Sequence, residues 1–306
     1  KIEGIMKKND TPKENLAYGN FLLSRFERRK KNYQKEFDCL VKAHNYYFDL
    51  KKEKFELGLK YTFDDVLQIS NFANIEKINK VSDDKIKPIF IVGVPRCGST
   101  LVEKIIGSGS KIISMGEELG ILDNYVSNKI LERQSLNLGS VADIRDELYS
   151  IYNSRGLLFK KNNYIFTDKS LNNFFYLKLI KEIYPSAKII NCKRDVLSSI
   201  MSIFQNNLTE LAWTHDLNNI FKYFDNYYNT VEKLKKTHSN FIYELEIEKL
   251  TNNPKNESKK LMEFCELPWD KKCLEFYKRK DLFTKTASNI QIRKAIYRHT
   301  GDKYLP

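Results

Sequence analysis

One segment limits the folds open to this chain more than any other: Pro88–Ile106, which reads PIFIVGVPRCGSTLVEKII. Pro88–Val92 is a short apolar run rich in β-branched residues, which predicts a buried strand. Gly93 and Gly98 follow with the spacing G-x-x-x-x-G, and Ser99–Ile106 has the character of a helix. A glycine turn between a strand and a helix presents backbone N–H groups and the positive helix end to a phosphate. The segment therefore predicts a phosphate-binding loop.

The residue after Gly98 separates two classes of nucleotide-binding protein. Nucleoside triphosphatases with this glycine spacing have a lysine there, whereas this chain has Ser99. A kinase uses that lysine together with Mg²⁺ to neutralise a triphosphate. Here Arg96 lies inside the loop and supplies a fixed cation, which suits a less charged ligand. A P-loop kinase-like phosphotransferase stays as the alternative, with ATP binding and Mg²⁺ dependence as its signature.

Beyond the loop, strand and helix patterns alternate to the end of the chain. The patterns predict strands at 164–167, 188–192 and 240–243, and helices at 174–183, 198–204, 216–235 and 255–265. Such alternation is typical of a parallel sheet covered on both faces. The fold class is therefore α/β, with a P-loop-type parallel sheet flanked by helices.

The N-terminal part, residues 1–80, is predicted to be a small helical region in front of the main domain, residues 81–306. Apolar residues recur at helical spacing from Pro12 to about Phe55, with a polar turn at 28–32. The two helices resemble a degenerate tetratricopeptide unit, with matching residues at Gly19, Tyr33, Leu40 and Ala43. A single repeat is weak support, because such arrays need about three repeats. A plain helical hairpin is the other reading.

The composition limits the kinds of ligand and partner that we expect for this chain. The net charge is +13, from 52 Lys and Arg against 39 Asp and Glu, which favours anionic ligands. The aromatic residues fall at core spacing and do not interleave with a basic stripe, so a nucleic-acid partner is not expected. The five cysteines form no C-x-x-C pair and the four histidines share no metal spacing. We expect no bound metal, no membrane span, and a reducing, cytoplasmic location; a homodimer is left open.

The phosphate-loop segment closely resembles the 5′-phosphosulfate loop of sulfotransferases that use 3′-phosphoadenosine-5′-phosphosulfate (PAPS). It is most similar to bacterial tetratricopeptide-repeat sulfotransferases and to tyrosylprotein sulfotransferases, which typically read P-R-S-G-T-T-L. This chain differs in having small residues, Cys97 and Ser99, at two of these positions. The resemblance implies that the loop binds PAPS. The implied loop contacts are Arg96, Cys97, Gly98, Ser99 and Thr100.

Two later blocks extend the resemblance to the C-terminus. Asp168–Asn173 and Pro185–Asp195 are similar to the family stretch D-K-x-x-x-N…P-x-A-x-I-I…R-D. It implies that Arg194 and Ser202 bind the PAPS 3′-phosphate. The second block contains L-P-W at Leu267–Trp269 and a basic loop that closes over the nucleotide, in which Arg293 and Lys294 are the implied cofactor contacts. One departure is Ile247, where the family often has a tyrosine.

The resemblance also implies the catalytic residues. Met115–Leu119 is similar to the G-E-E segment of the tyrosylprotein enzymes, which makes Glu118 the expected general base and Glu117 the alternative. Both carboxylates also suit the start of a helix, where they would be ordinary dipole-favoured residues. Lys169 and Arg96 are expected to stabilise the leaving phosphate. Ser288 is expected to contact the transferred group.

The sequence thus predicts an enzyme that transfers a sulfuryl group from PAPS to an acceptor hydroxyl by in-line displacement, releasing adenosine 3′,5′-bisphosphate. The acceptor is left open among a protein tyrosine, a sugar, a lipid and a small phenol. A catalytically dead scaffold is the remaining rival, and the presence of Arg96, Glu118, Lys169, Arg194 and Ser202 argues against it.

Overall fold

The computed structural model describes residues 2–6, 10–72, 74–76, 86–111, 113–158, 165–237, 241–279 and 293–296. The chain divides into two compact units, one formed by Lys1–Leu67 with Ile200–Asn226 and the other by Gln68–Ser199 with Tyr227–Pro306. Residues 200–226 thus belong with the N-terminal helices, and the boundary near residue 80 stays a prediction. Among the described residues, no helix combines the length and apolar character needed to cross a membrane.

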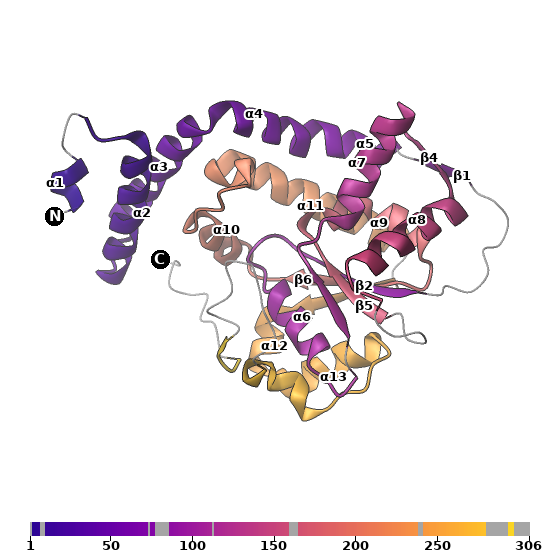
Figure 1. Cartoon of the computed structure of the whole chain (residues 1–306). Coiled ribbons are helices and arrows are strands. Elements are labelled where there is room, and N and C mark those ends of the chain that lie inside the picture. The colour runs from indigo at the N-terminus through magenta and orange to yellow at the C-terminus, as the bar shows by residue number, and fades with distance from the viewer. Residues whose placement is uncertain are drawn as a thin grey trace. The chain divides into compact units, whose positions relative to one another are not determined.

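The first unit is helical. Its elements are α1 (Ile2–Met6), α2 (Lys13–Arg29), α3 (Tyr33–Leu50), α4 (Lys52–Lys60), a π-helical turn η1 (Tyr61–Asp65) and a 3-10 turn η3 (Ala212–His215). It shares α5 (Val66–Phe72), α10 (Val196–Phe204) and α11 (Leu217–Thr237) with the second unit. The predicted break lies between α2 and α3, where Asn32 caps α3 through its side chain. The two helices form a hairpin (Figure 1); its tetratricopeptide character stays a prediction.

The core of this helical unit holds a pair of buried histidines. His44 and His215 are hydrogen-bonded through their Nδ1 atoms at 2.9 Å, and His44 Nε2 lies 2.7 Å from the carbonyl oxygen of Phe204. The rings of Tyr47 and Phe55 stack on His215. These two histidines are therefore packing residues of the helical core.

The second unit contains the parallel sheet that the alternating pattern predicts. Its strands are β2 (Lys87–Val92), β3 (Ser114–Glu117), β5 (Ile165–Lys169), β6 (Lys188–Lys193) and β7 (Ile242–Glu246). They pair in the order β3-β5-β2-β6-β7, and each neighbouring pair is parallel. A separate parallel pair joins β1 (Asn74–Glu76) to β4 (Asn137–Ser140). The fold class is confirmed as α/β.

Helices cover both faces of the five-stranded sheet. They are α6 (Ser99–Gly107), α7 (Ile121–Arg133), α8 (Val141–Ser154), α9 (Leu177–Ile183), α12 (Ile247–Asn252) and α13 (Pro254–Phe264), with 3-10 turns η2 (Leu171–Tyr176), η5 (Lys271–Leu274) and η6 (Phe276–Lys278). Figure 1 shows α8 and α9 on one side of the sheet and α6, α12 and α13 on the other. The central strands are accordingly apolar on both faces: Ile89, Phe90, Ile91 and Val92 of β2 are all buried.

The histidine pair should make the helical unit sensitive to acid. Burial lowers the pKa of His44 to about 4; burial and the neighbouring His44 together lower the pKa of His215 to about 3. Both pKa values lie below the ordinary histidine value of 6.5. Between pH 6.5 and these values, the unfolded chain therefore binds more protons than the folded chain does. Stability is therefore complete above pH 6.5 and declines as pH falls toward 4. His44 alone accounts for about 3 kcal/mol over that window.

Tryptophan fluorescence can follow this unit separately. The chain has two tryptophans, and Trp213 stacks on Tyr223 within the helical unit. In a Trp269→Phe background, the free energy of unfolding is measured by denaturant titration with Trp213 fluorescence. It should fall between pH 6.5 and pH 4.5. His44→Phe in the same background should flatten that decline. An equally steep decline in this variant would contradict the assignment to the histidine pair.

Candidate active site

The phosphate loop occupies the end of the central strand. β2 ends at Val92 and α6 begins at Ser99, so residues 93–98 form the turn that the sequence predicts. Gly98 has φ +96° and Arg96 has φ +68°, both in the left-handed region. A Cβ at Gly98 would lie 2.9 Å from Ile247 Cδ1, because α12 packs against the turn. Glycine is required here for backbone conformation and for space.

The second glycine position of the loop is equally crowded. A methyl group at Gly93 would collide with Cys97 Sγ and would lie 3.0 Å from the carbonyl oxygen of Cys192. Both cysteines are free thiols and both are buried. A hydrogen bond with Cys192 lowers the pKa of the Cys97 thiol, against the effect of its burial. Cys97, which differs from the usual family serine, therefore fills the space beneath the loop.

Arg194 lies at the end of β6 and reaches the phosphate loop. Its Nη1 donates a hydrogen bond of 2.8 Å to the carbonyl oxygen of Arg96. The predicted contact residues Ser99 and Arg194 are half-buried, while Thr100 is buried. The structure therefore brings Arg96, the loop and Arg194 together at one edge of the sheet.

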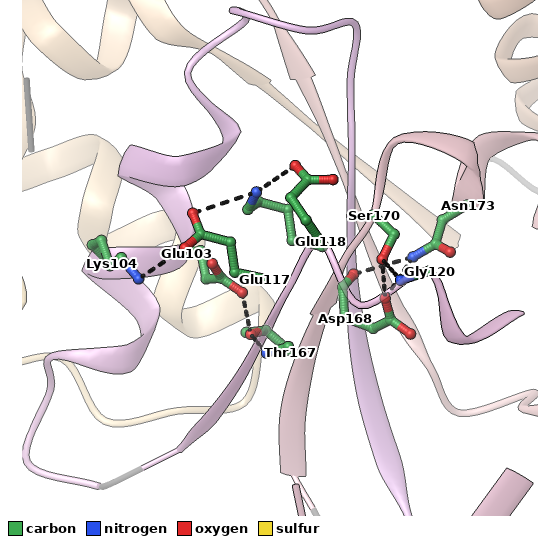
Figure 2. Close-up of polar contacts among 11 residues, drawn as sticks. Glu103, Lys104, Glu117, Glu118, Gly120, Thr167, Asp168, Ser170 and Asn173 are labelled. Atoms are coloured by element: carbon green, nitrogen blue, oxygen red, sulfur yellow. Dashed lines mark hydrogen bonds and ion pairs between the residues drawn. The ribbon is translucent and has the colours of Figure 1, made fainter. Parts of the chain in front are cut away.

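Lys169, the last residue of β5, is the centre of a buried ion cluster beside the loop. Lys169 Nζ lies 2.8 Å from Glu118 Oε1 and 3.6 Å from Glu117 Oε1, while Lys104 Nζ lies 3.8 Å from Glu117 Oε2. Figure 2 shows the ion pair between Glu117 and Lys104 as a dashed line. Burial alone would lower the pKa of Lys169, but Glu118, Glu103 and Glu117 together raise it. Lys169 is therefore held as a cation.

The two glutamates do not begin a helix, so the alternative reading of them as helix-start residues is wrong. Glu117 ends β3 and Glu118 follows in a turn with φ +52°, three residues before α7. The Glu118 backbone N–H donates to the carbonyl oxygen of Lys169 at 2.6 Å. The Glu118 side chain is 36% exposed, against 10% for Glu117. Of the two carboxylates, Glu118 is the one that an incoming molecule can reach.

Asp168, one residue before Lys169, is buried and anchors the turn after β5. Its carboxylate accepts hydrogen bonds from Tyr152 at 3.0 Å, Asn173 at 2.8 Å and Ser170 at 3.2 Å. The Ser170 hydroxyl in turn accepts from the backbone N–H of Gly120 at 3.0 Å (Figure 2). Burial raises the pKa of Asp168, and the three donors oppose that shift. This network fixes the β5 end against the segment that carries Glu118.

The roles of the remaining predicted site residues stay predictions. Ser202 is on α10 in the part that belongs to the helical unit, where its carbonyl oxygen accepts from Asn206. Arg293 and Lys294 are exposed. Ser288 lies outside the described residues. The Trp269 block has a visible structural role, because its indole N–H donates to Ser258 and Asp270 accepts from the Ser110 backbone N–H.

Glu103, Lys104 and Thr167 are not among the site residues predicted from the sequence. All three are buried, and Thr167 Oγ1 donates to Glu103 Oε1 at 2.7 Å. The available signal was a Glu-Lys pair inside the otherwise apolar helix STLVEKIIG, where charged residues are unusual unless they are paired. Among the described residues, no cluster of three or more metal-ligating side chains occurs.

A groove of about 650 Å³ lies between α7 and α8. Leu119, the residue after Glu118, is among the residues that line it. Polar side chains predominate in the rest of its lining, including Asn124, Asn128, Ser154 and Arg155. The Lys129 ammonium and the Tyr125 hydroxyl, also in the lining, are both bonded to Glu147. The groove thus offers amide and hydroxyl groups beside an internally balanced charge pair.

A family profile matches more than half of the chain. Residues 88–271 match the profile of the sulfotransferase family. The chain is 29% identical to an uncharacterised protein of Aquifex aeolicus (strain VF5), over 99% of this chain but 41% of that one. It therefore spans about two fifths of the length of that relative.

Three solved structures show weaker similarity. They are the sulfotransferase domain of the Synechococcus PCC 7002 olefin synthase (TM-score 0.47, 18% identity, 72% of this chain and 88% of that one), the sulfotransferase domain of the curacin biosynthetic pathway (0.45, 18%, 70% and 85%), and a sulfotransferase of Mycobacterium avium (0.43, 10%, 96% and 94%).

The phosphate loop can be tested for its need of glycine. Gly98→Ala should lower the free energy of unfolding by about 1–2 kcal/mol, because alanine is strained at positive φ, and the collision with Ile247 adds to the loss. In an Ile247→Ala background, where the collision is relieved, Gly98→Ala should cost only the part due to backbone strain. Gly4→Ala is a matched control, since its Cβ would meet nothing within 4 Å. Chemical denaturation of the wild type, the three single variants and the double variant measures these differences, and a Gly98→Ala variant as stable as the wild type would contradict the account.

Proposed function

The chain belongs to the sulfotransferase family, and we propose that it transfers a sulfuryl group from PAPS to an acceptor hydroxyl. The observation that carries the proposal is the meeting of four strand ends at one edge of the sheet. There the phosphate loop after β2 adjoins Lys169, Glu118 and Arg194. An anion site, two fixed cations and a reachable carboxylate are the groups that such a transfer needs.

The residues at this edge fit a nucleotide of this kind. The turn leads into the start of α6, where backbone N–H groups suit a phosphate or sulfate. Gly98 preserves the shape of the turn, because a larger residue would collide with Ile247. Lys169 is a buried cation and Arg194 is fixed on the loop carbonyl. We propose that the loop residues Arg96 to Thr100 hold the phosphosulfate. Arg194, together with Ser202, Arg293 and Lys294, holds the rest of the nucleotide.

PAPS supplies the sulfuryl group. The protein orients the acceptor, accepts its proton and balances the charge on the leaving group. Glu118 accepts the proton of the attacking hydroxyl, because its carboxylate is the more exposed of the pair. Lys169 and Arg96 balance the negative charge on the leaving phosphate. Ser288 stays a proposed contact of the transferred group, and no role is proposed for a metal ion.

We assign acceptor entry to the groove between α7 and α8. Its lining residue Leu119 follows Glu118 directly in the chain, so the groove borders the segment that carries the proposed base. The charged side chains of the lining are balanced, with Lys129 and Arg155 against Glu132 and Glu147, so the groove favours an uncharged acceptor with hydroxyl or amide groups over a strongly acidic one.

Nucleotide binding tests the donor assignment. Isothermal titration should show tight binding of adenosine 3′,5′-bisphosphate and weak binding of ATP with Mg²⁺. Arg194→Ala should weaken the binding of adenosine 3′,5′-bisphosphate by about 10- to 100-fold, the effect of a lost charge-assisted contact. Lys193→Ala is the matched control, because Lys193 pairs with Glu244. Similar affinity for both nucleotides, unchanged by Arg194→Ala, would refute the assignment and favour the kinase-like alternative.

Measurements of turnover test the assignment of Glu118 as the general base. Release of adenosine 3′,5′-bisphosphate from PAPS is followed with a panel of phenol, sugar and peptide acceptors. Glu118→Gln should keep nucleotide affinity and lose about 10²- to 10⁴-fold in kcat, the usual contribution of a general base. Glu117→Gln is the paired variant and should lose less. The reverse order would move the base role to Glu117.

A further inference from the structure

Glu103 is a buried carboxyl group for which the proposed mechanism has no role so far. It lies on α6, one turn beyond the phosphate loop, and is 0% exposed. Thr167 Oγ1 donates to its Oε1 at 2.7 Å, and the Thr167 hydroxyl itself accepts from the Gly116 backbone N–H at 3.3 Å. Its other oxygen, Oε2, is buried without a hydrogen-bond partner in the described part of the chain. An ionised oxygen in such a place is costly.

The charges around Glu103 come from three elements. Lys104 lies beside it on α6, Glu117 is on β3 and Lys169 is on β5; Lys169 and Lys104 lower its pKa and Glu117 raises it. The two ammonium groups are already matched by two carboxylates, those of Glu117 and Glu118. The cluster is therefore neutral when Glu103 is protonated and carries one negative charge when Glu103 is ionised.

The protonation of Glu103 changes in the neutral range. Burial raises its pKa, Lys169, the Thr167 hydrogen bond and Lys104 offset only part of that rise, and the resulting pKa is about 7. Both forms of the carboxyl are therefore present near pH 7, and a modest change in the local charge shifts the balance between them.

We propose that Glu103 is a positioning residue for sulfuryl transfer: held by Thr167 behind Lys169, its carboxyl sets the net charge that decides how readily Lys169 leaves Glu118 for the nucleotide. This inference rests on the proposed function. With Glu103 neutral, the cluster is balanced, and Lys169 can serve the bridging oxygen of the donor. With Glu103 ionised, the extra negative charge holds Lys169 back and repels the anionic nucleotide.

The first consequence is proton uptake when a nucleotide binds. The negative charge of adenosine 3′,5′-bisphosphate near Lys169 favours the protonated form of Glu103, so the wild-type chain should take up part of a proton at pH 7. Titration calorimetry in two buffers of different ionisation enthalpy measures this uptake directly. Glu103→Gln should reduce it, because the amide cannot titrate.

Thr167→Val gives a second variant that keeps the carboxyl. Thr167 lowers the pKa of Glu103, so losing its hydroxyl should move the pH of maximal uptake upward. Thr62→Val is the control, since the Thr62 hydroxyl donates to the Gly58 carbonyl oxygen within the helical unit. Equal uptake in the wild type, Glu103→Gln and Thr167→Val would overturn the role of Glu103. Failure of the wild type to bind adenosine 3′,5′-bisphosphate would instead overturn the proposed function.

The second consequence concerns turnover. Because Glu103 ionises as pH rises through about 7, kcat/KM for PAPS should decline severalfold between pH 7 and pH 9 in the wild type. Glu103→Gln keeps the neutral form and should remove that decline. A Glu103→Gln variant with the same alkaline decline as the wild type would contradict the proposal, since a purely structural side chain would lower activity without changing the pH profile.

Discussion

The parallel pairing of β3, β5, β2 and β6 is the constraint on which the site depends. Parallel strands end at the same edge of a sheet, so Val92, Glu117, Lys169 and Lys193 are brought to one side although they are far apart in sequence. The register is specific: Glu117 lies opposite Lys169, and Val92 lies opposite Asn191. A shift of one residue would turn these side chains to the other face of the sheet, and the ion cluster would not form.

The buried charges behind that edge stabilise one another. Removing an ammonium or a carboxylate from water is expensive unless a partner of opposite charge is close. Lys104 and Lys169 therefore require Glu117 and Glu118, as Asp168 requires its three donors. The same arrangement keeps Lys169 charged and aimed at the edge where the phosphate loop lies. The same contacts thus stabilise the turn after β5 and keep a charged lysine available for an anionic ligand.

The sequence predicted the central sheet because β2 and β6 are apolar runs buried on both faces, and it predicted the phosphate loop because its glycines have a fixed spacing. It missed β3, since Ser114–Glu117 is short and has no apolar run, and so left open the alternative reading of Glu117 and Glu118 as helix-start residues. The pairing of His44 with His215 and of Glu103 with Thr167 is set by tertiary packing. Neither spacing nor composition carries that information.

Ile247, the first residue of α12, packs directly against Gly98. The shape of the phosphate loop is therefore determined partly by a residue about 150 positions later in the chain. Exchange at position 247 offers a way to reshape the turn while its own sequence is left intact.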